Sequence, residues 1–479
     1  MKRVIALLFI CLFTLAMGFT GCSVNREQDR KNPAVTPEGN KTDDDKNAEK
    51  DEINEDASEA ANAPDENVIK VWCYNYEVSS ALAKFKELNP DFSYEFKITD
   101  FSTICVDYHQ ALYQALVDGG PDAPDIYTVE SGHAIKYTQG DAYPYAAGYE
   151  DLGIDVDALL EETSVPQYFI DIGTNPDGKL VGLGYQSMAG AFFYRRSIAK
   201  DVWDTDDPSV IKDIIGPGWD KFFEAAADLR AKGYGICSGP NDIWHSVENS
   251  ADQGWVIDGK LAIDPKREEF LDLAMKLKEN DYHNNTRDWT DEWYNDMKDA
   301  GEKKIFGFFG PYWILNHVII RNCGGEAVGE GTYGDWAVCE PPIGFFWGGT
   351  LVLANKESRH LAAMGEILKW ITLDTSDTGF QYLLADGKFR FGFKDAVASA
   401  TVMKKFDGAL DFLGGQNAFD VYASAGDLAN GKNITQYDAL INMYWLDQVY
   451  EYTAGNKSRE QAIADFKQQV ANNLDVIVE

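Results

Sequence analysis

Basic residues are scarce in this chain. Among its 479 residues, 43 are Lys or Arg and 78 are Asp or Glu, so the formal net charge is −35. Nucleic-acid grooves and electrostatic docking sites on anionic lipid both need basic patches. The composition therefore disfavours a nucleic-acid partner and a purely electrostatic contact with a membrane.

Cysteine and histidine are few as well. Of the seven Cys, Cys11 and Cys22 belong to the N-terminal apolar segment and its end, which leaves an odd number in the remaining chain. A complete disulfide framework within one monomer is thereby excluded, and buried free thiols are the simplest interpretation. The spacing of the Cys suits no zinc site, and the six His form no obvious cluster. We expect no metal and no cofactor; whether any Cys pair is bonded stays open.

Several motifs of enzymes and nucleotide-binding proteins are missing from the sequence. It contains no GxSxG, no HExxH and no phosphate-binding GxxxxGKS/T. Carboxylates are abundant, so a pair suited to glycoside hydrolysis stays possible at this point. We nevertheless expect a protein that is not an enzyme, because the order of its segments does not resemble a hydrolase barrel.

Long hydrophobic runs are limited to the N-terminus. Lys2 and Arg3 precede a mostly apolar run from Val4 to Thr20, which is the pattern of a secretory signal peptide. The run is marginal for a membrane-spanning helix, which needs about 20 apolar residues. No other stretch approaches this length, so we expect an exported chain with a soluble body.

The sequence Phe19-Thr20-Gly21-Cys22 resembles the processing site of bacterial lipoproteins. The resemblance implies that residues 1–21 are a signal peptide and that Cys22 carries a lipid anchor with acyl chains such as palmitate. Several acyl chains hold a protein on a membrane more firmly than one, at about 0.8 kcal/mol per buried CH₂. The alternative is an ordinary secreted protein in which Cys22 is incidental.

Residues 22–66 are predicted to be a lipidated Cys followed by a disordered acidic tether. From Ser23 to Glu66 there are 14 acidic and 6 basic residues and almost no large apolar ones. Such a composition buries too little apolar surface to offset chain entropy, and like charges extend it. We expect a spacer that holds a folded body away from the membrane.

The folded body contains the residues that a core needs: over the whole chain 45% are hydrophobic and 13% aromatic. Val68 to Trp72 reads as a strand, a helix ends at Asn89-Pro90, and Phe92 to Ile98 alternates as a half-buried strand. A helix around Tyr108 to Asp118 and a strand over Asp125 to Val129 complete a βαβαβ unit. The unit predicts an α/β fold with a mostly parallel, doubly wound sheet, in which ligands bind beyond the carboxyl ends of the strands.

Five motifs follow one another along residues 68 to 475. They are Val71-Trp72 with Gly120-Pro121-Asp122, then Gly178-Lys179-Leu180-Val181-Gly182, Gly310-Pro311-Tyr312-Trp313, Pro341-Pro342 with Trp347-Gly348-Gly349-Thr350, and a final helix after Gly455. In this order they resemble the extracellular solute-binding lipoproteins of ABC importers, in the carbohydrate-binding branch that includes maltodextrin-binding proteins. Gly184 stands where that family usually has Pro, which puts the stiffness of the first crossing strand in doubt.

The resemblance implies a two-lobed periplasmic-binding-protein-like fold of type II, with an interlobe cleft and crossing hinge strands. The first lobe would comprise residues 67–187 and 350–395, and the second 188–349 and 396–479. Gly348-Gly349 supports a hinge physically, because glycine absorbs backbone rotation at little cost. The resemblance also implies a monomer that captures an oligosaccharide outside the cell and presents it to the transmembrane subunits of a permease.

A sugar has hydroxyls at its edge and an apolar face, so its binding site combines aromatic rings with donors and acceptors. The aromatic candidates are those beside the cleft motifs: Trp244, Tyr312, Trp313 and Trp347. The polar candidates follow strands, lie at a crossing or stand in a turn: Tyr74, Asn75, Glu77, Glu130, Gln186 and Asp242. Carboxylates suit vicinal hydroxyls because charge-assisted hydrogen bonds are strong.

Three alternatives stay open. The same fold could bind a polyamine or another small solute, since acidic groups suit cations, or it could feed a sensor kinase instead of a transporter. A secreted glycoside hydrolase is the third. Residues 67–479 carry −29 of the net charge, so the acidity is mainly that of the folded body and favours a neutral or cationic ligand over an anionic one.

Overall fold

The computed structural model describes residues 67–101, 106–389 and 392–479. The expected signal peptide, Cys22 and the acidic tether lie outside these residues, so what was inferred about them stays a prediction. Cys105 also lies outside them.

The first β-sheet has five strands in the order β2-β1-β3-β10-β4. The expected βαβαβ unit is confirmed, because β1 pairs in parallel with both β2 and β3. Strand β10 instead runs antiparallel to β3 and β4, so the sheet is mixed, and it places Thr350 opposite Glu130 at the end of β3. The strands are β1 (Val68–Cys73), β2 (Glu95–Asp100), β3 (Ile126–Glu130), β4 (Gly182–Gly184) and β10 (Thr350–Ala354).

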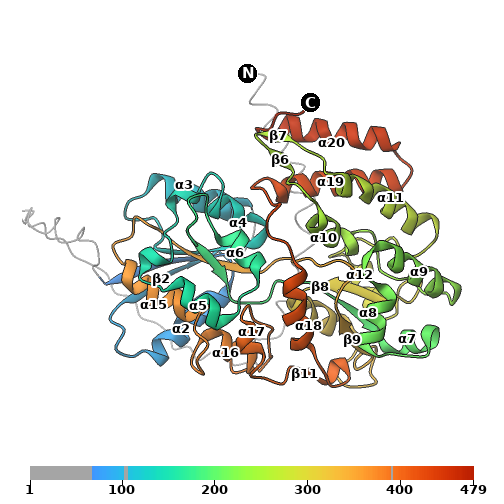
Figure 1. Ribbon diagram of the computed structural model, residues 1–479, viewed down its shortest axis with the longest axis horizontal. Coiled ribbons are helices and arrows are strands. Elements are labelled where there is room, and N and C mark those ends of the chain that lie inside the picture. The colour runs from blue at the N-terminus through green and yellow to red at the C-terminus, as the bar shows by residue number, and fades with distance from the viewer. Residues whose placement is uncertain (1–66, 102–105, 390–391) are drawn as a thin grey trace, which may run out of the picture. The chain divides into compact units, whose positions relative to one another are not determined.

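Helices cover both faces of this sheet, as the doubly wound prediction requires (Figure 1). Phe85 of α2 (Tyr76–Leu88) packs against Trp370 of α15 (Leu361–Thr372), with ring centroids 5.3 Å apart, so these helices share one face. His109 of α3 (Val106–Asp118) stacks on His133 of α4 (Ser131–Thr138) at 4.0 Å on the other face. Further helices of this lobe are α5 (Val156–Thr163), α6 (Gln167–Gly173) and α16 (Phe380–Ala385).

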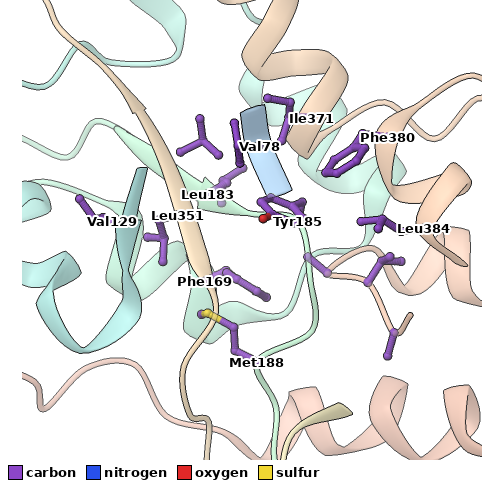
Figure 2. Close-up of a cluster of buried hydrophobic side chains, with 14 of the residues drawn as sticks. Val78, Val129, Phe169, Leu183, Tyr185, Met188, Leu351, Ile371, Phe380 and Leu384 are labelled. Atoms are coloured by element: carbon purple, nitrogen blue, oxygen red, sulfur yellow. The ribbon is translucent and has the colours of Figure 1, made fainter. Parts of the chain in front are cut away.

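The core of this lobe continues toward the second lobe (Figure 2). Leu183 and Leu351 come from paired strands and are fully buried, as is Val78 of α2. The ring of Tyr185 lies 5.0 Å from that of Phe380, centroid to centroid. These contacts fix the end of β4, from which the chain leaves the sheet.

The edge strand β2 departs from its predicted burial. The alternation from Phe92 onward predicts a half-buried strand, but the strand begins only at Glu95 and Ile98 is 38% exposed. Phe92 instead packs edge-on against Phe85, at 5.0 Å between centroids. β2 is the edge strand of the sheet, and most of its residues are exposed.

The second β-sheet has three antiparallel strands in the order β8-β5-β9. They are β5 (Ala191–Arg195), β8 (Gly307–Gly310) and β9 (Trp336–Cys339). Phe222 packs against Phe309 of β8, with ring centroids 5.8 Å apart. The helices around this sheet are α7 (Arg196–Trp203), α8 (Pro208–Ile215), α9 (Gly218–Ala231), α10 (Asn241–Ser250), α11 (Pro265–Glu279), α12 (Asp291–Met297), α13 (Tyr312–Ile314) and α18 (Ala418–Ala425).

The C-terminal helices α19 (Asp438–Thr453) and α20 (Arg459–Asn473) pack on each other, and α19 also packs on α11 (Figure 1). Ser458 caps α20, since its Oγ accepts a hydrogen bond from the backbone N–H of Gln461 at 3.2 Å. Trp445 and Phe466 meet between the two helices at 5.0 Å, centroid to centroid. This packing fixes α19, which borders the cavity described below.

Three segments of the chain cross between the lobes, and backbone hydrogen bonds join them. The N–H of Trp347 donates to the carbonyl of Met188 and that of Gly190 to Phe345, at 2.9 and 2.8 Å. The N–H of Ser187 donates to the carbonyl of Ala396 at 2.9 Å, which adds the third segment. These pairings form the crossing strands of the two-lobed, type II arrangement that the family resemblance implies.

We propose one refinement of the lobe boundaries. Helix α17 (Ala400–Met403) follows the third crossing and contacts α5 and α16, and the hydroxyl of Ser399 donates to the carbonyl of Thr163 at 2.7 Å. Helix α18 contacts β5 and β9 of the other sheet. On these contacts, the chain enters the second lobe between Met403 and Ala418 rather than at residue 395.

Cys73, Cys237, Cys323 and Cys339 are all buried and free, which confirms that interpretation for the described Cys. Burial raises the pKa of the Cys73 thiol to about 12, and the nearby carboxylate of Asp100 adds to the effect. A thiol of this kind stays protonated and unreactive.

No helix among the residues drawn as ribbon in Figure 1 is long and apolar enough to cross a membrane.

The crossing at Gly349 predicts a measurable stability difference. Gly349 has φ of +88°, and a Cβ there would lie 2.5 Å from Cγ of Met188. Gly153 has a similar φ of +84°, but nothing lies within 4 Å of a Cβ. Gly153→Ala should cost about 1–2 kcal/mol of unfolding free energy from backbone strain alone, and Gly349→Ala should cost more. Urea unfolding followed by circular dichroism measures both; equal losses would contradict the steric contact.

Candidate functional site

A cavity of about 480 Å³ lies between the lobes. From the first lobe it is bordered by Glu130, Ser131 and Gly132, where β3 ends and α4 begins. This is the carboxyl end of a parallel strand, where the βαβαβ unit predicts a ligand. The second lobe contributes helices α10 and α19, the loop at residues 287–289 and the crossing at residues 346–348.

Aromatic rings form one wall of the cavity. Trp244, Trp289, Trp347 and Tyr450 line it directly. Trp313 contacts this wall: its ring is nearly parallel to that of Trp289, at 7° and 6.1 Å between centroids, and its indole N–H donates to the carbonyl of Trp347 at 3.2 Å. The arrangement offers flat apolar faces of the kind that pack against sugar rings.

Trp289 is unusual in both conformation and exposure. Its φ is +61°, a region that residues other than glycine rarely adopt, and the residue is 43% exposed. Backbone strain of this kind costs of order 1–3 kcal/mol and clusters at functional sites. A large aromatic side chain held at the cavity in this way adds little to the core, and this favours a role in binding.

Five Asn side chains supply neutral donors and acceptors to the cavity. They are Asn241, Asn249, Asn430, Asn433 and Asn442. Each of them has a partner in the chain and keeps its place through it. Asn241 donates to Asp288 at 2.7 Å, Asn442 to Glu248 at 2.5 Å and Asn433 to the carbonyl of Ala251 at 2.8 Å. The amide oxygens of Asn249 and Asn430 accept from backbone N–H groups, at 3.4 and 3.0 Å. Amide groups that both donate and accept match the hydroxyls of a sugar.

Carboxylates also border the cavity. They are Glu130, Glu248, Asp288, Asp438 and Asp447. Glu130 accepts from the backbone N–H of Gly132 at 2.8 Å, which caps α4. Arg287 lies 3.2 Å from Asp447, and its guanidinium carbon lies 3.9 Å from the ring centroid of Tyr450. His245 stacks on Trp347 at 4.4 Å and reaches Glu248 at 3.3 Å.

The pKa values of Asp438 and Glu248 shift in opposite directions, although both carboxyls are buried. Burial raises the pKa of Asp438 to about 7, with a further contribution from the negative charge of Glu248. Burial acts the same way on Glu248, but His245, Arg267 and Asn442 together outweigh it and hold the pKa of Glu248 below its usual value. Asp438 is therefore the carboxyl whose charge at neutral pH responds to what enters the cavity.

Four polar atoms of the cavity residues lack a hydrogen-bond partner among the described residues. They are Nε1 of Trp244, Oδ1 of Asn241, Oδ2 of Asp438 and the hydroxyl of Tyr450. Trp244 is 2% and Asp438 3% exposed. Buried polar groups in native proteins are almost always satisfied by protein, water or ligand. Their gathering around one cavity marks it as the candidate binding site.

The structure brings some of the predicted residues to this cavity. Glu130, Trp244 and Trp347 line it, and Trp313 contacts the lining residues Trp289 and Trp347. Tyr312, the remaining aromatic candidate, does not line it. It is fully buried and packs against two aromatic side chains of α18, Tyr422 and Phe419, at 5.3 and 5.8 Å between centroids.

Three other predicted residues support the cavity without lining it. The Tyr74 hydroxyl and the Asn75 amide both bond to Thr350, which pairs with Glu130 across the sheet. Asp242 accepts from the backbone N–H groups of Ser238 and Gly239, at 2.6 and 3.2 Å. These side chains hold the loops next to the cavity in place.

Glu77 and Gln186 lie toward a second, smaller cavity. Glu77 accepts from the hydroxyl of Tyr185 at 2.7 Å, and Gln186 donates to Asp395 at 2.8 Å. Glu77 and Asp395 line a cavity of about 240 Å³ together with Arg321. The predicted polar residues thus divide between two cavities.

Sequence reasoning did not find most of the second-lobe lining. The missed residues include the five Asn named above and His245, Glu248, Arg287, Asp288, Trp289, Asp438, Asp447 and Tyr450. Those on α10 and α19 were missed because polar and aromatic residues in such helical sequences are typical of ordinary surface helices. For Trp289, the available signal was a large aromatic residue set between the polar neighbours Asp288 and Thr290.

The burial of Asp242 predicts a pH-dependent stability. Burial raises its pKa to about 7 in the folded chain, against about 3.9 in an unfolded one. The stability that its protonation contributes is fully present below about pH 4 and is lost as the pH rises toward 7. Relative to Asp242→Asn, wild type should lose up to about 1.4 kcal/mol of unfolding free energy per pH unit in that window.

Urea unfolding at about pH 4.5, 5.5, 6.5 and 7.5 measures this difference. If wild type instead gains stability over the variant as the pH rises, the ionised carboxylate is the favoured form in the folded chain and the predicted direction is wrong.

No family model matches the chain, and a search of characterised proteins by sequence also returned no match. Solved structures do match along most of its length. A protein described as extracellular solute-binding protein family 1 is 17% identical with a TM-score of 0.69, over 84% of this chain and 99% of that one. The galacto-N-biose-/lacto-N-biose I-binding protein of the ABC transporter from Bifidobacterium longum, in complex with lacto-N-biose, is 16% identical with a TM-score of 0.60, over 86% and 98%.

The sugar-binding protein MalE from Xanthomonas citri gives a further match. It is 13% identical with a TM-score of 0.60, and the match covers 85% of this chain and 96% of that one. In each case nearly the whole neighbouring chain is matched. The chain therefore has the two-lobed α/β fold of the extracellular solute-binding proteins.

Proposed function

We propose that the protein captures an oligosaccharide in the cavity between its lobes and delivers it to the permease of an ABC importer. The observation that carries the proposal is the cavity itself. Its wall of Trp rings, its five Asn side chains and its unsatisfied polar atoms combine apolar faces with hydrogen-bonding groups. The neighbours in fold support it, since several were solved as binding proteins of ABC transporters with a saccharide bound.

A binding protein fits this geometry better than an enzyme. The cavity lies where two lobes can close around a solute, and closure is a shift of population limited by how much better the closed state binds. A micromolar dissociation constant corresponds to about −8 kcal/mol. Stacking on two or three rings and several buried hydrogen bonds can supply that after the cost of ordering.

The place of action follows from the N-terminus. We propose that Cys22 anchors the chain by lipid to the outer face of the bacterial cell membrane and that the acidic tether spaces the lobes from it. In that position the protein would act as a monomer and hand its ligand to the transmembrane subunits of the permease. The sequence around Cys22 supports this.

Calorimetric titration with a panel of plant and starch oligosaccharides tests the binding function. At least one should bind, and Trp289→Ala should weaken it at least ten-fold while changing the unfolding free energy little, because Trp289 is half exposed at the cavity. Trp219→Ala is the matched control, since Trp219 packs on Phe222 away from the cavity. Binding of an amino acid or a metal ion, with no saccharide bound, would contradict the proposal.

The anchor has a separate test. Full-length chain expressed in a bacterial host should sediment with the membranes, whereas Cys22→Ser should be released into the soluble fraction. The neighbouring substitution Ser23→Ala, which keeps the thiol, serves as the control. A Cys22→Ser chain that stays with the membranes would show that something other than the lipid holds it there.

A further inference from the structure

The charge of the cavity is unbalanced. Five carboxylates line it, and Arg287 is the only Lys or Arg among the described lining residues. Arg287 already forms an ion pair with Asp447, at 3.2 Å, and its guanidinium covers the ring of Tyr450. A cavity lined by one sign of charge concentrates ligands of the opposite sign.

The remaining carboxylates are held mainly by neutral donors. Asp288 accepts from the Asn241 amide, and Asp438 accepts from the backbone N–H of Thr435 at 3.0 Å and from its hydroxyl. Glu130 accepts from the Gly132 backbone and lies 3.5 Å from His133. Neutral donors satisfy hydrogen-bonding capacity but leave the negative charge of Glu130 and Asp288 in place. Burial raises the pKa of Asp438 to about 7, so Asp438 is ionised in part of the molecules at neutral pH, and a cation beside it favours the ionised form.

The cationic groups behind the cavity do not remove this imbalance. Arg267 is fully buried and acts on Asp438 and Glu248 through space, but its guanidinium donates to the backbone carbonyls of Gln253 and Asn433, at 3.0 and 3.3 Å. His245 reaches Glu248 only. No described side chain gives Asp438 a direct ion pair.

Asp438 supplies a second observation, independent of the number of acids. It is 3% exposed, it lines the cavity, and its Oδ2 has no hydrogen-bond partner. A buried carboxyl oxygen left unpaired costs free energy, and a charged partner stabilises it most. The aromatic wall adds to this, because the faces of Trp and Tyr rings attract cations.

The excess of carboxylates and the unpaired Oδ2 of Asp438 favour a ligand that carries a positive charge as well as a sugar ring. We infer that the ligand is an amino sugar: a saccharide whose protonated amine lies at the carboxylates around Asp438 while its ring packs on the Trp wall. The inference rests on the proposed function. The five Asn and the flat aromatic faces distinguish such a ligand from a linear polyamine, which has neither hydroxyls to pair with amides nor a ring face to stack.

Matched ligands test the inference. Glucosamine and its β1,4-linked trimer are compared by calorimetry with glucose and cellotriose, and with the N-acetylated trimer, which keeps the ring but loses the charge. The amine-bearing ligand should bind at least ten-fold more tightly than either neutral partner. Its affinity should also fall more steeply when the salt concentration rises, because a charge pair is screened.

Asp438→Asn provides the variant. It should reduce the ratio of amine to neutral affinity toward one, whereas Asp420→Asn, which removes an exposed charge on α18, should leave that ratio unchanged. The unfolding free energy of each variant is measured alongside. If Asp438→Asn fails to fold, Glu248→Gln gives the same comparison from α10.

The possible outcomes separate the two proposals. Preferential binding of the amines, lost in Asp438→Asn, supports the inference. Neutral saccharides that bind as well as or better than the amines overturn it and leave the proposed function standing. Binding of spermidine with no saccharide of any kind overturns both, since the cavity would then recognise charge without a sugar ring.

Discussion

The backbone contact between residues 188–190 and 345–347 determines where every other part of the site lies. It joins the strand that leaves the first sheet to the segment that returns to it, through the hydrogen bonds at Met188–Trp347 and Gly190–Phe345. Beyond this contact the returning chain forms β10, which runs antiparallel to β3. Glu130 at the end of β3 and Trp347 at the crossing both line the cavity, and this contact helps to fix the position of one relative to the other.

The crossing also explains why the site has two kinds of lining. The first lobe meets the cavity with the end of a strand and the start of a helix, where the backbone N–H of Gly132 donates to Glu130. The second lobe meets it with the sides of α10 and α19, which carry most of the polar groups and the ring of Trp244. A solute held between them contacts a small, rigid surface on one side and a larger, chemically varied one on the other.

The fold was largely predictable from the sequence, because it depends on local patterns. The alternation of strands and helices from Val68 to Val129 is a short-range signal, and the structure has each of these elements, although β2 begins at Glu95 rather than Phe92. The site was less predictable because it depends on which side of a helix faces the other lobe. Trp313 reaches the aromatic wall and its neighbour Tyr312 packs in the core, and no feature of Gly310-Pro311 distinguishes the two. Asp242 likewise looks like a ligand-binding carboxylate until its backbone partners are known.

The near-parallel rings of Trp289 and Trp313, with Trp347 beside them, have a spectroscopic consequence. Indole emission shifts to shorter wavelength when water leaves the ring, and Trp289 is the exposed member of this group. A solute that covers it changes the light the protein emits without any added dye. The same residues that would hold the ligand therefore make its arrival visible, and the colour change reports on this cavity rather than on the remaining Trp of the chain.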